Sequence, residues 1–134
     1  MIEFEIMKLR LKNNSVRLRL TQTETARFAE TGQVKEKIEF GLEPYQQFIY
    51  ALETDSEIEE IQAIIENNWI TVLIPKTQAD EWTQTAQVGM EAEQMIRGGK
   101  TLRLLIEKDF ACLEARTGED ETDSFPHPLE GKVC

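Results

Sequence analysis

The sequence contains few of the residues on which most catalytic and metal sites depend. Its one histidine, His127, stands between two prolines, and its two cysteines, Cys112 and Cys134, are too far apart for a CxxC site. No HExxH, GxSxG, GxGxxG or P-loop pattern occurs. These absences argue against zinc, imidazole and P-loop chemistry and against a disulfide framework, so we expect reduced thiols and a solvated histidine.

Positive charge and long apolar runs are scarce as well. The chain has 15 Lys and Arg against 25 Asp and Glu, a net charge of −10, which repels nucleic acid and anionic membranes. No apolar run approaches the roughly 18 residues of a transmembrane helix, and the N-terminus does not resemble a signal peptide. We therefore expect a cytoplasmic protein that binds neither membranes nor nucleic acid.

The clearest positive signal is a β-hairpin in residues 7–21. Apolar and charged residues alternate on both sides of Asn13-Asn14, and asparagine tolerates the positive φ that a type I′ turn requires. Pairing outward from this turn places Leu9 opposite Leu18. One face of the hairpin is then apolar, and the other carries Lys8, Arg10, Lys12, Arg17 and Arg19.

A short helix is predicted after the hairpin. Thr21 and Glu24 form a capping-box pattern, and Gly32 is a stop signal. Alternation resumes at residues 34–40 and 45–52, on either side of a turn at residues 41–44. These patterns predict a strand-strand-helix-strand-strand unit.

The second half repeats this unit. A shift of 54 positions lays residues 13–34 on residues 67–88 and aligns Phe28 with Trp82. The shift gives identities at Asn67, Asn68, Thr77, Thr85, Gln87 and Val88. The last two strands would turn at residues 97–100.

The predicted fold is α+β, a duplicated ββαββ unit with about eight antiparallel strands in a barrel-like or rolled sheet. Two short helices, bearing Phe28 and Trp82, would cover the apolar faces. We expect one domain at residues 1–113, with halves of about 1–54 and 55–113, and an acidic, Pro-containing tail at 114–134. The alternation slips at Ile6-Met7, so residues 1–6 are either an extension or precede a bulge.

The cationic side of the hairpin has two interpretations. It is either the solvated side of a sheet, balanced by acids on neighbouring strands, or an anion site that Arg103 joins. The planar fork of arginine suits phosphate oxygens, whereas no aromatic residue interleaves to stack on nucleic acid. The acidic run at residues 119–123 lacks calcium-loop spacing, and we expect it to lie over these cations.

Three stretches resemble a family of short, uncharacterised bacterial proteins of unknown function. They are MKLRLKNNSVRLRLT, ENNWITVLIPK followed by Trp82, and EKDFACL followed by GEDETDSFPHP. The resemblance spans residues 7–128. It implies that the acidic tail belongs to the domain and that residues 1–6 are an extension, but no activity, ligand or catalytic residue.

The expected architecture also resembles the triphosphate-tunnel (CYTH) phosphohydrolases, whose duplicated unit closes into an eight-stranded barrel. This resemblance implies a tunnel wall in which Lys35, Lys37 and Glu39 join the cationic hairpin. It also implies a divalent metal, for which Glu91, Glu93 and Glu107 are the candidates. The Glu-x-Glu-x-Lys signature of that family is matched one residue out of step, by Glu3, Glu5 and Lys8.

We therefore expect a non-enzymatic binding or structural module without a cofactor. Its partner would be an anionic small molecule or an acidic protein, bound by Lys8, Arg10, Lys12, Arg17, Arg19 and Arg103. The alternative is a Mg²⁺-dependent phosphohydrolase acting on a triphosphate-type substrate. The ligand and the oligomeric state stay open.

Overall fold

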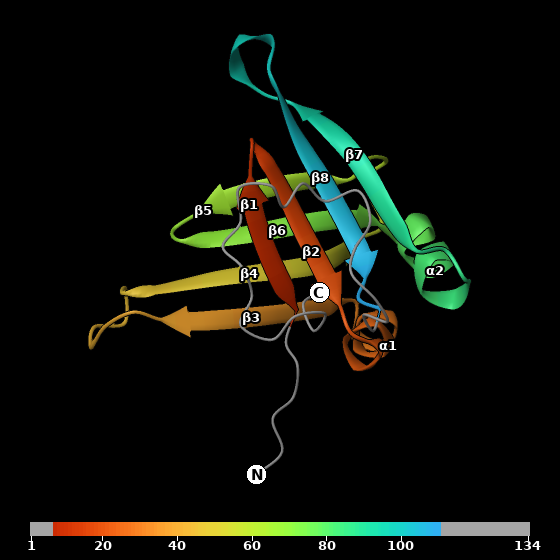
Figure 1. Cartoon of the computed structure of the whole chain (residues 1–134), viewed down its shortest axis with the longest axis horizontal. Helices are drawn as coiled ribbons and strands as arrows, with labels where there is room; N and C mark the ends of the chain where they lie inside the picture. The colour runs from red at the N-terminus through yellow and green to blue at the C-terminus, as the bar shows by residue number, and fades with distance from the viewer. Residues whose placement is uncertain (1–6, 111–134) are drawn as a thin grey trace, which may run out of the picture.

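The computed structural model describes residues 7–110, and its first element is the predicted hairpin. Strands β1 (Lys8–Lys12) and β2 (Ser15–Leu20) are joined by Asn13 and Asn14, with φ of 48° and 56° (Figure 1). These are the positive φ values of a type I′ turn. Leu9 lies opposite Leu18, which confirms the predicted register.

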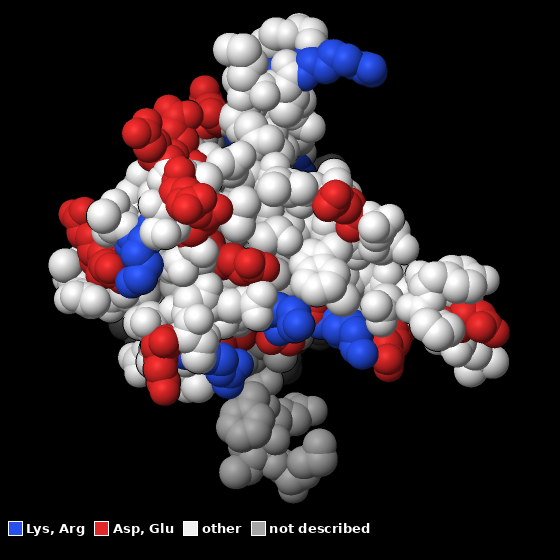
Figure 2. Space-filling view, turned by 180° about the vertical axis from the view of Figure 1, so that it is seen from behind, with Lys and Arg blue, Asp and Glu red and all other residues white. Residues whose placement is uncertain are grey.

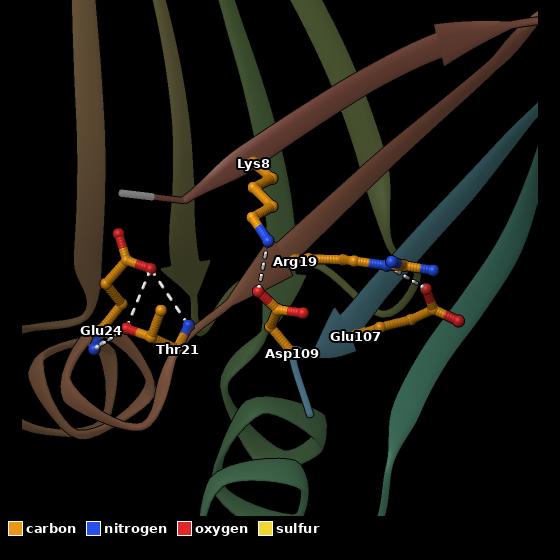
Figure 3. Close-up of polar contacts among 6 residues, drawn as sticks. All are labelled: Lys8, Arg19, Thr21, Glu24, Glu107 and Asp109. Atoms are coloured by element: carbon orange, nitrogen blue, oxygen red, sulfur yellow. Dashed lines mark hydrogen bonds and ion pairs between the residues drawn. The ribbon is translucent and has the colours of Figure 1, made fainter. Parts of the chain in front are cut away.

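Helix α1 (Gln22–Thr31) begins at the predicted capping box (Figure 3). The Thr21 hydroxyl accepts a hydrogen bond from the Glu24 N–H at 3.3 Å, and Glu24 Oε1 accepts one from the Thr21 N–H at 3.0 Å. Each bond satisfies a backbone donor that the first helical turn leaves unpaired. Gly32 ends the helix in the left-handed conformation, with φ of 78°.

The remaining elements confirm the predicted count of eight strands and two helices. The second hairpin turns at Asn67 and Asn68, with φ of 48° and 64°. The elements are β3 (Gln33–Glu39), β4 (Gln47–Asp55), β5 (Gln62–Glu66), β6 (Trp69–Pro75), α2 (Lys76–Gln84), β7 (Gly89–Met95), the 3₁₀ turn η1 (Arg97–Gly99) and β8 (Thr101–Lys108).

The strands form two four-stranded sheets, which we call sheet A (β1-β2-β8-β7) and sheet B (β3-β4-β6-β5). Their strands cross at a steep angle in Figure 1. The central pairs, β2 with β8 and β4 with β6, are parallel, so the prediction of an all-antiparallel sheet was wrong. Alternation shows which residues share a face, but it does not show which distant strand becomes the neighbour.

The described residues do not form a closed barrel, because each sheet ends in two edge strands. One open corner is bridged by a side chain from β7 instead of by a strand. The Gln94 amide oxygen accepts from the Ala63 N–H at 2.6 Å, and its NH₂ group donates to the Ala63 carbonyl at 3.1 Å. Gln94 thus pairs the exposed backbone of edge strand β5 as a neighbouring strand would.

The inner faces of the two sheets form one core. Leu18 and Leu104 of sheet A are buried against Leu52 and Val72 of sheet B. The two helices lie together at one end of the sheets in Figure 1 and contribute the two largest fully buried side chains of the described residues. These are Phe28 and Trp82, whose rings meet edge to face with centroids 6.1 Å apart. The helices bearing these two residues were predicted to cover the apolar faces of the sheet.

Each half of the chain supplies one hairpin to each sheet. Sheet A combines the first hairpin with the last, and sheet B combines the two middle hairpins. If β1 and β2 are replaced by β5 and β6, and β8 and β7 by β4 and β3, the order of sheet A becomes β5-β6-β4-β3. This is the order of sheet B read from its other edge. This relation is consistent with a duplicated unit, which stays a prediction.

Candidate anion-binding face

The register of sheet A arranges outward-facing side chains in rows across its four strands. The six cations predicted from sequence, Lys8, Arg10, Lys12, Arg17, Arg19 and Arg103, all lie on this outer face, which we call the cationic face. From β1 to β7 the rows are Lys12, Ser15, Arg103, Glu93; then Arg10, Arg17, Leu105, Glu91; then Lys8, Arg19, Glu107, Gly89. Charge therefore changes from positive on β1 and β2 to negative on β7.

Part of the cationic face is balanced by neighbouring acids, as expected for a solvated sheet. Glu107 Oε1 lies 3.1 Å from Arg17 Nε and 3.4 Å from Arg19 Nε. These three side chains are 23–29% exposed, so their attraction is less screened than that of fully exposed pairs. Asp109 pairs with Lys8 at 2.8 Å (Figure 3).

The end of the face near the β1–β2 turn is different. A shallow pocket of about 280 Å³ lies there. It is lined by Arg10, Lys12, Asn13, Ser15, Arg17, Arg103 and Leu105. Within residues 7–110, no carboxylate lies within ion-pair distance of Arg10 or Lys12. Arg10 also stands directly opposite Arg17, an arrangement of like charges that costs stability.

The three candidate metal ligands share this face but do not form a group. Glu107 is held by two arginines, Glu91 Oε2 pairs with Arg103 at 3.2 Å, and Glu93 stands opposite Arg103. Among the described residues no three potential ligands come together around a possible ion.

Lys35, Lys37 and Glu39, expected in the same wall, lie on the outer face of sheet B instead. Lys35 Nζ stands 5.4 Å from the centre of the Trp69 ring, and Lys37 pairs with Glu39 at 3.4 Å. Seen from this opposite side in Figure 2, positive and negative side chains are interspersed. The strands form two sheets whose outer faces point away from each other, so the expected single wall was wrong.

Sequence reasoning missed a group of titratable side chains near β3. Glu36 faces inward opposite Tyr50, and Glu24 is only 3% exposed. Burial, reinforced by the negative charge of Glu24, raises the pKa of Glu36. Burial, followed by the charges of Glu36 and Glu24, likewise raises the pKa of Tyr50, whose hydroxyl donates to the Met7 carbonyl at 2.6 Å. The available signal was the inward position of Glu36 between Val34 and Ile38.

Several predictions concern residues outside the described part of the chain. They are the reduced state of Cys112 and Cys134, the solvated His127, the segment at residues 1–6 and the tail at residues 114–134. Within the described part, no helix has the length and apolarity needed to cross a membrane.

The fold and this face define a small α+β protein with two mixed sheets, one of which has a strongly cationic outer surface. The chain belongs to a family of unknown function (DUF7009), whose model matches residues 7–129. The expected resemblance to an uncharacterised family is therefore confirmed, and the match includes the acidic run at residues 119–123. No curated protein and no solved structure matches the chain, and nothing supports the resemblance to tunnel-type phosphohydrolases.

Proposed function

We propose that this protein is a non-enzymatic binding module that captures polyanions, compounds with several phosphate groups, on the cationic face. The observation that carries the proposal is the pocket in which Arg10, Lys12, Arg17 and Arg103 converge from three strands. Arginine can bind two phosphate oxygens at once, and Asn13 and Ser15 add neutral donors at the rim. The pocket is shallow, which suits a charged ligand that keeps part of its hydration.

The fold by itself does not require cations at these positions. Sheet B has the same strand plan, and its β5–β6 and β4–β6 pairs have the registers of β1–β2 and β2–β8, yet its outer face is different. Where sheet A has Lys8, Arg10, Lys12, Arg17, Arg19 and Arg103, sheet B has Gln62, Ile64, Glu66, Thr71, Leu73 and Ile49. A sheet of this design is therefore built without the repulsion that the cationic face contains, which supports a binding role for the cations.

Titration calorimetry with tripolyphosphate at low salt tests this role. The variant Arg10→Gln/Lys12→Gln should bind tripolyphosphate at least about tenfold more weakly, because charge-assisted hydrogen bonds are lost. Both side chains are exposed and unpaired within residues 7–110, so the melting temperature should stay nearly unchanged.

The matched control is Arg27→Gln/Lys37→Gln, which removes two exposed cations that do not line the pocket. It should bind tripolyphosphate nearly as the unmodified protein does. An equal loss in both variants would show that only the overall charge matters. Failure of the unmodified protein to bind tripolyphosphate at low salt would end the proposal.

We also propose that the two halves descend from one ββαββ unit, of which one sheet acquired the cationic face. The repeated order of elements and the two Asn-Asn turns with similar φ values support this history. Superposition of the halves in an experimental structure should place β1 on β5 and β8 on β4. A superposition that cannot match both helices and all four strand pairs would contradict it.

A further inference from the structure

We propose that residues 119–123 of the same chain dock on the cationic face, so that an external polyanion binds by displacing them. This segment contains four acids, Glu119, Asp120, Glu121 and Asp123. The docking itself stands on charge and connectivity, whereas the competition rests on the proposed function.

The described chain ends beside the cationic face. The Asp109 N–H donates to the Leu20 carbonyl at 2.8 Å, which continues the pairing of β8 with β2. Its carboxylate lies 2.8 Å from Lys8 Nζ (Figure 3). The chain therefore leaves the sheet next to the row that contains Lys8 and Arg19.

The segment can reach every row of this face. About ten residues separate Asp109 from Glu119, and an extended chain of that length spans up to about 33 Å. Along β1, the distance from Lys8 to Lys12 is roughly 13 Å, because a strand rises about 3.3 Å per residue. Residues 119–123 can thus lie over the pocket without displacing any strand.

The pocket contains cations for which the segment can supply acids. Four cations line it, of which Arg17 and Arg103 are paired with Glu107 and Glu91, whereas within residues 7–110 neither Arg10 nor Lys12 has an ion-pair partner. On the opposite sheet, Lys37 is already paired with Glu39 and Lys35 lies over Trp69. Exposed ion pairs are weak singly, but linkage to the same chain gives the segment a high effective concentration.

The family match supports a role for this segment in the domain. The model covers residues 7–129, so it includes residues 119–123 together with both sheets. The segment is therefore part of the family domain, carries four acids, and follows a described chain that ends beside the cationic face.

Carbodiimide cross-linking of the full chain tests the docking directly, because this reagent joins lysine to carboxylate only on contact. Mass spectrometry of the monomer should show Lys12 joined to residues 119–123, and the link should disappear in high salt and in Lys12→Gln. Links from Lys8 to Asp109 and from Lys76 to Asp80, whose atoms lie 2.8 Å and 2.6 Å apart, show that the reagent works. Those two links without any link from Lys12 to the segment would overturn the proposal.

Calorimetry then tests the competition. In the full chain, E119Q/D120N/E121Q/D123N should bind tripolyphosphate about tenfold more tightly, since the competing acids are gone. The matched variant E43Q/E57Q/E59Q/E60Q removes the same four charges from exposed positions elsewhere and should change affinity much less. Equal gains in both variants would overturn the competition. A Lys12 cross-link without tripolyphosphate binding by any variant would retain the docking and reject the proposed function.

Discussion

At the residue scale, Glu36 places an ionisable carboxyl group on the side of β3 that faces the core. It projects from the inward side of β3, opposite Tyr50, and the negative charge of Glu24 lies nearby. Burial and this charge raise the pKa of Glu36, so the folded state binds its proton more tightly than the unfolded state does. The contribution of Glu36 to stability is therefore full below its ordinary pKa and is lost as the pH rises through the raised value.

Replacing Glu36 with Gln should consequently raise the melting temperature at pH 7, because the variant carries no charge to bury. The gain should shrink as the pH falls from the raised pKa toward 4.5, the ordinary pKa of the glutamate side chain, and should be absent below it. Thermal denaturation at several pH values measures the difference. The control, Glu30→Gln, changes an exposed carboxyl on α1. A gain that is the same at every pH would mean that shape or packing, and not ionisation, is responsible.

At the element scale, Gly32 joins α1 to β3 and contacts the neighbouring strand. Its N–H donates to the Phe28 carbonyl at 2.8 Å, and its own carbonyl accepts from the Thr54 N–H at 2.9 Å. Its φ of 78° suits glycine, and a Cβ at this position would stand 2.8 Å from Thr54 Oγ1. Helix termination and the contact with β4 thus depend on the same residue.

The variant Gly32→Ala should lower the free energy of unfolding by about 2 kcal/mol or more, from backbone strain together with the close contact. Gly98→Ala is the matched control because Gly98 has the same φ of 78° but no atom near its would-be Cβ. It should cost only about 1 kcal/mol. Urea unfolding compares the two variants. Equal losses would mean that Thr54 moves aside without cost.

At the scale of the whole molecule, the two helices close one end of the space between the sheets. Phe28 from α1 and Trp82 from α2 are almost completely buried, and their rings contact each other. The Trp82 indole N–H donates to the Val88 carbonyl at 3.1 Å, so this large side chain leaves no buried polar atom unpaired. Both halves of the chain meet in this contact.

Replacing either aromatic side chain with alanine should therefore destabilise the protein strongly. Phe28→Ala and Trp82→Ala should each lower the free energy of unfolding by about 3–5 kcal/mol, and the double variant should lose less than the sum. Phe40→Ala, at a position that is 73% exposed, should stay within about 0.5 kcal/mol of the unmodified protein. Denaturant unfolding measures all four. Additive losses would show that the two helices cover separate parts of the core.

Much of this fold follows from local interactions, and for that reason the sequence alone predicts it. The Asn-Asn turns need only residues that tolerate positive φ, and the limits of α1 need only Thr21, Glu24 and Gly32. Alternation with a period of two then assigns each strand residue to one face. These rules placed five of the six predicted cations on one side of a single hairpin before any tertiary contact was known.

Which hairpin lies beside which was decided by the tertiary structure alone. The alternation of apolar and polar residues does not indicate which distant strand lies alongside a given strand. It therefore could not distinguish one antiparallel barrel from two mixed sheets. The parallel pairing of β2 with β8 brought Arg103 and Glu107 to the cationic face, whereas the pairing of β3 with β4 took Lys35 and Lys37 to the opposite side. Long-range burial of the apolar faces selects these partners, and burial depends on the whole chain at once.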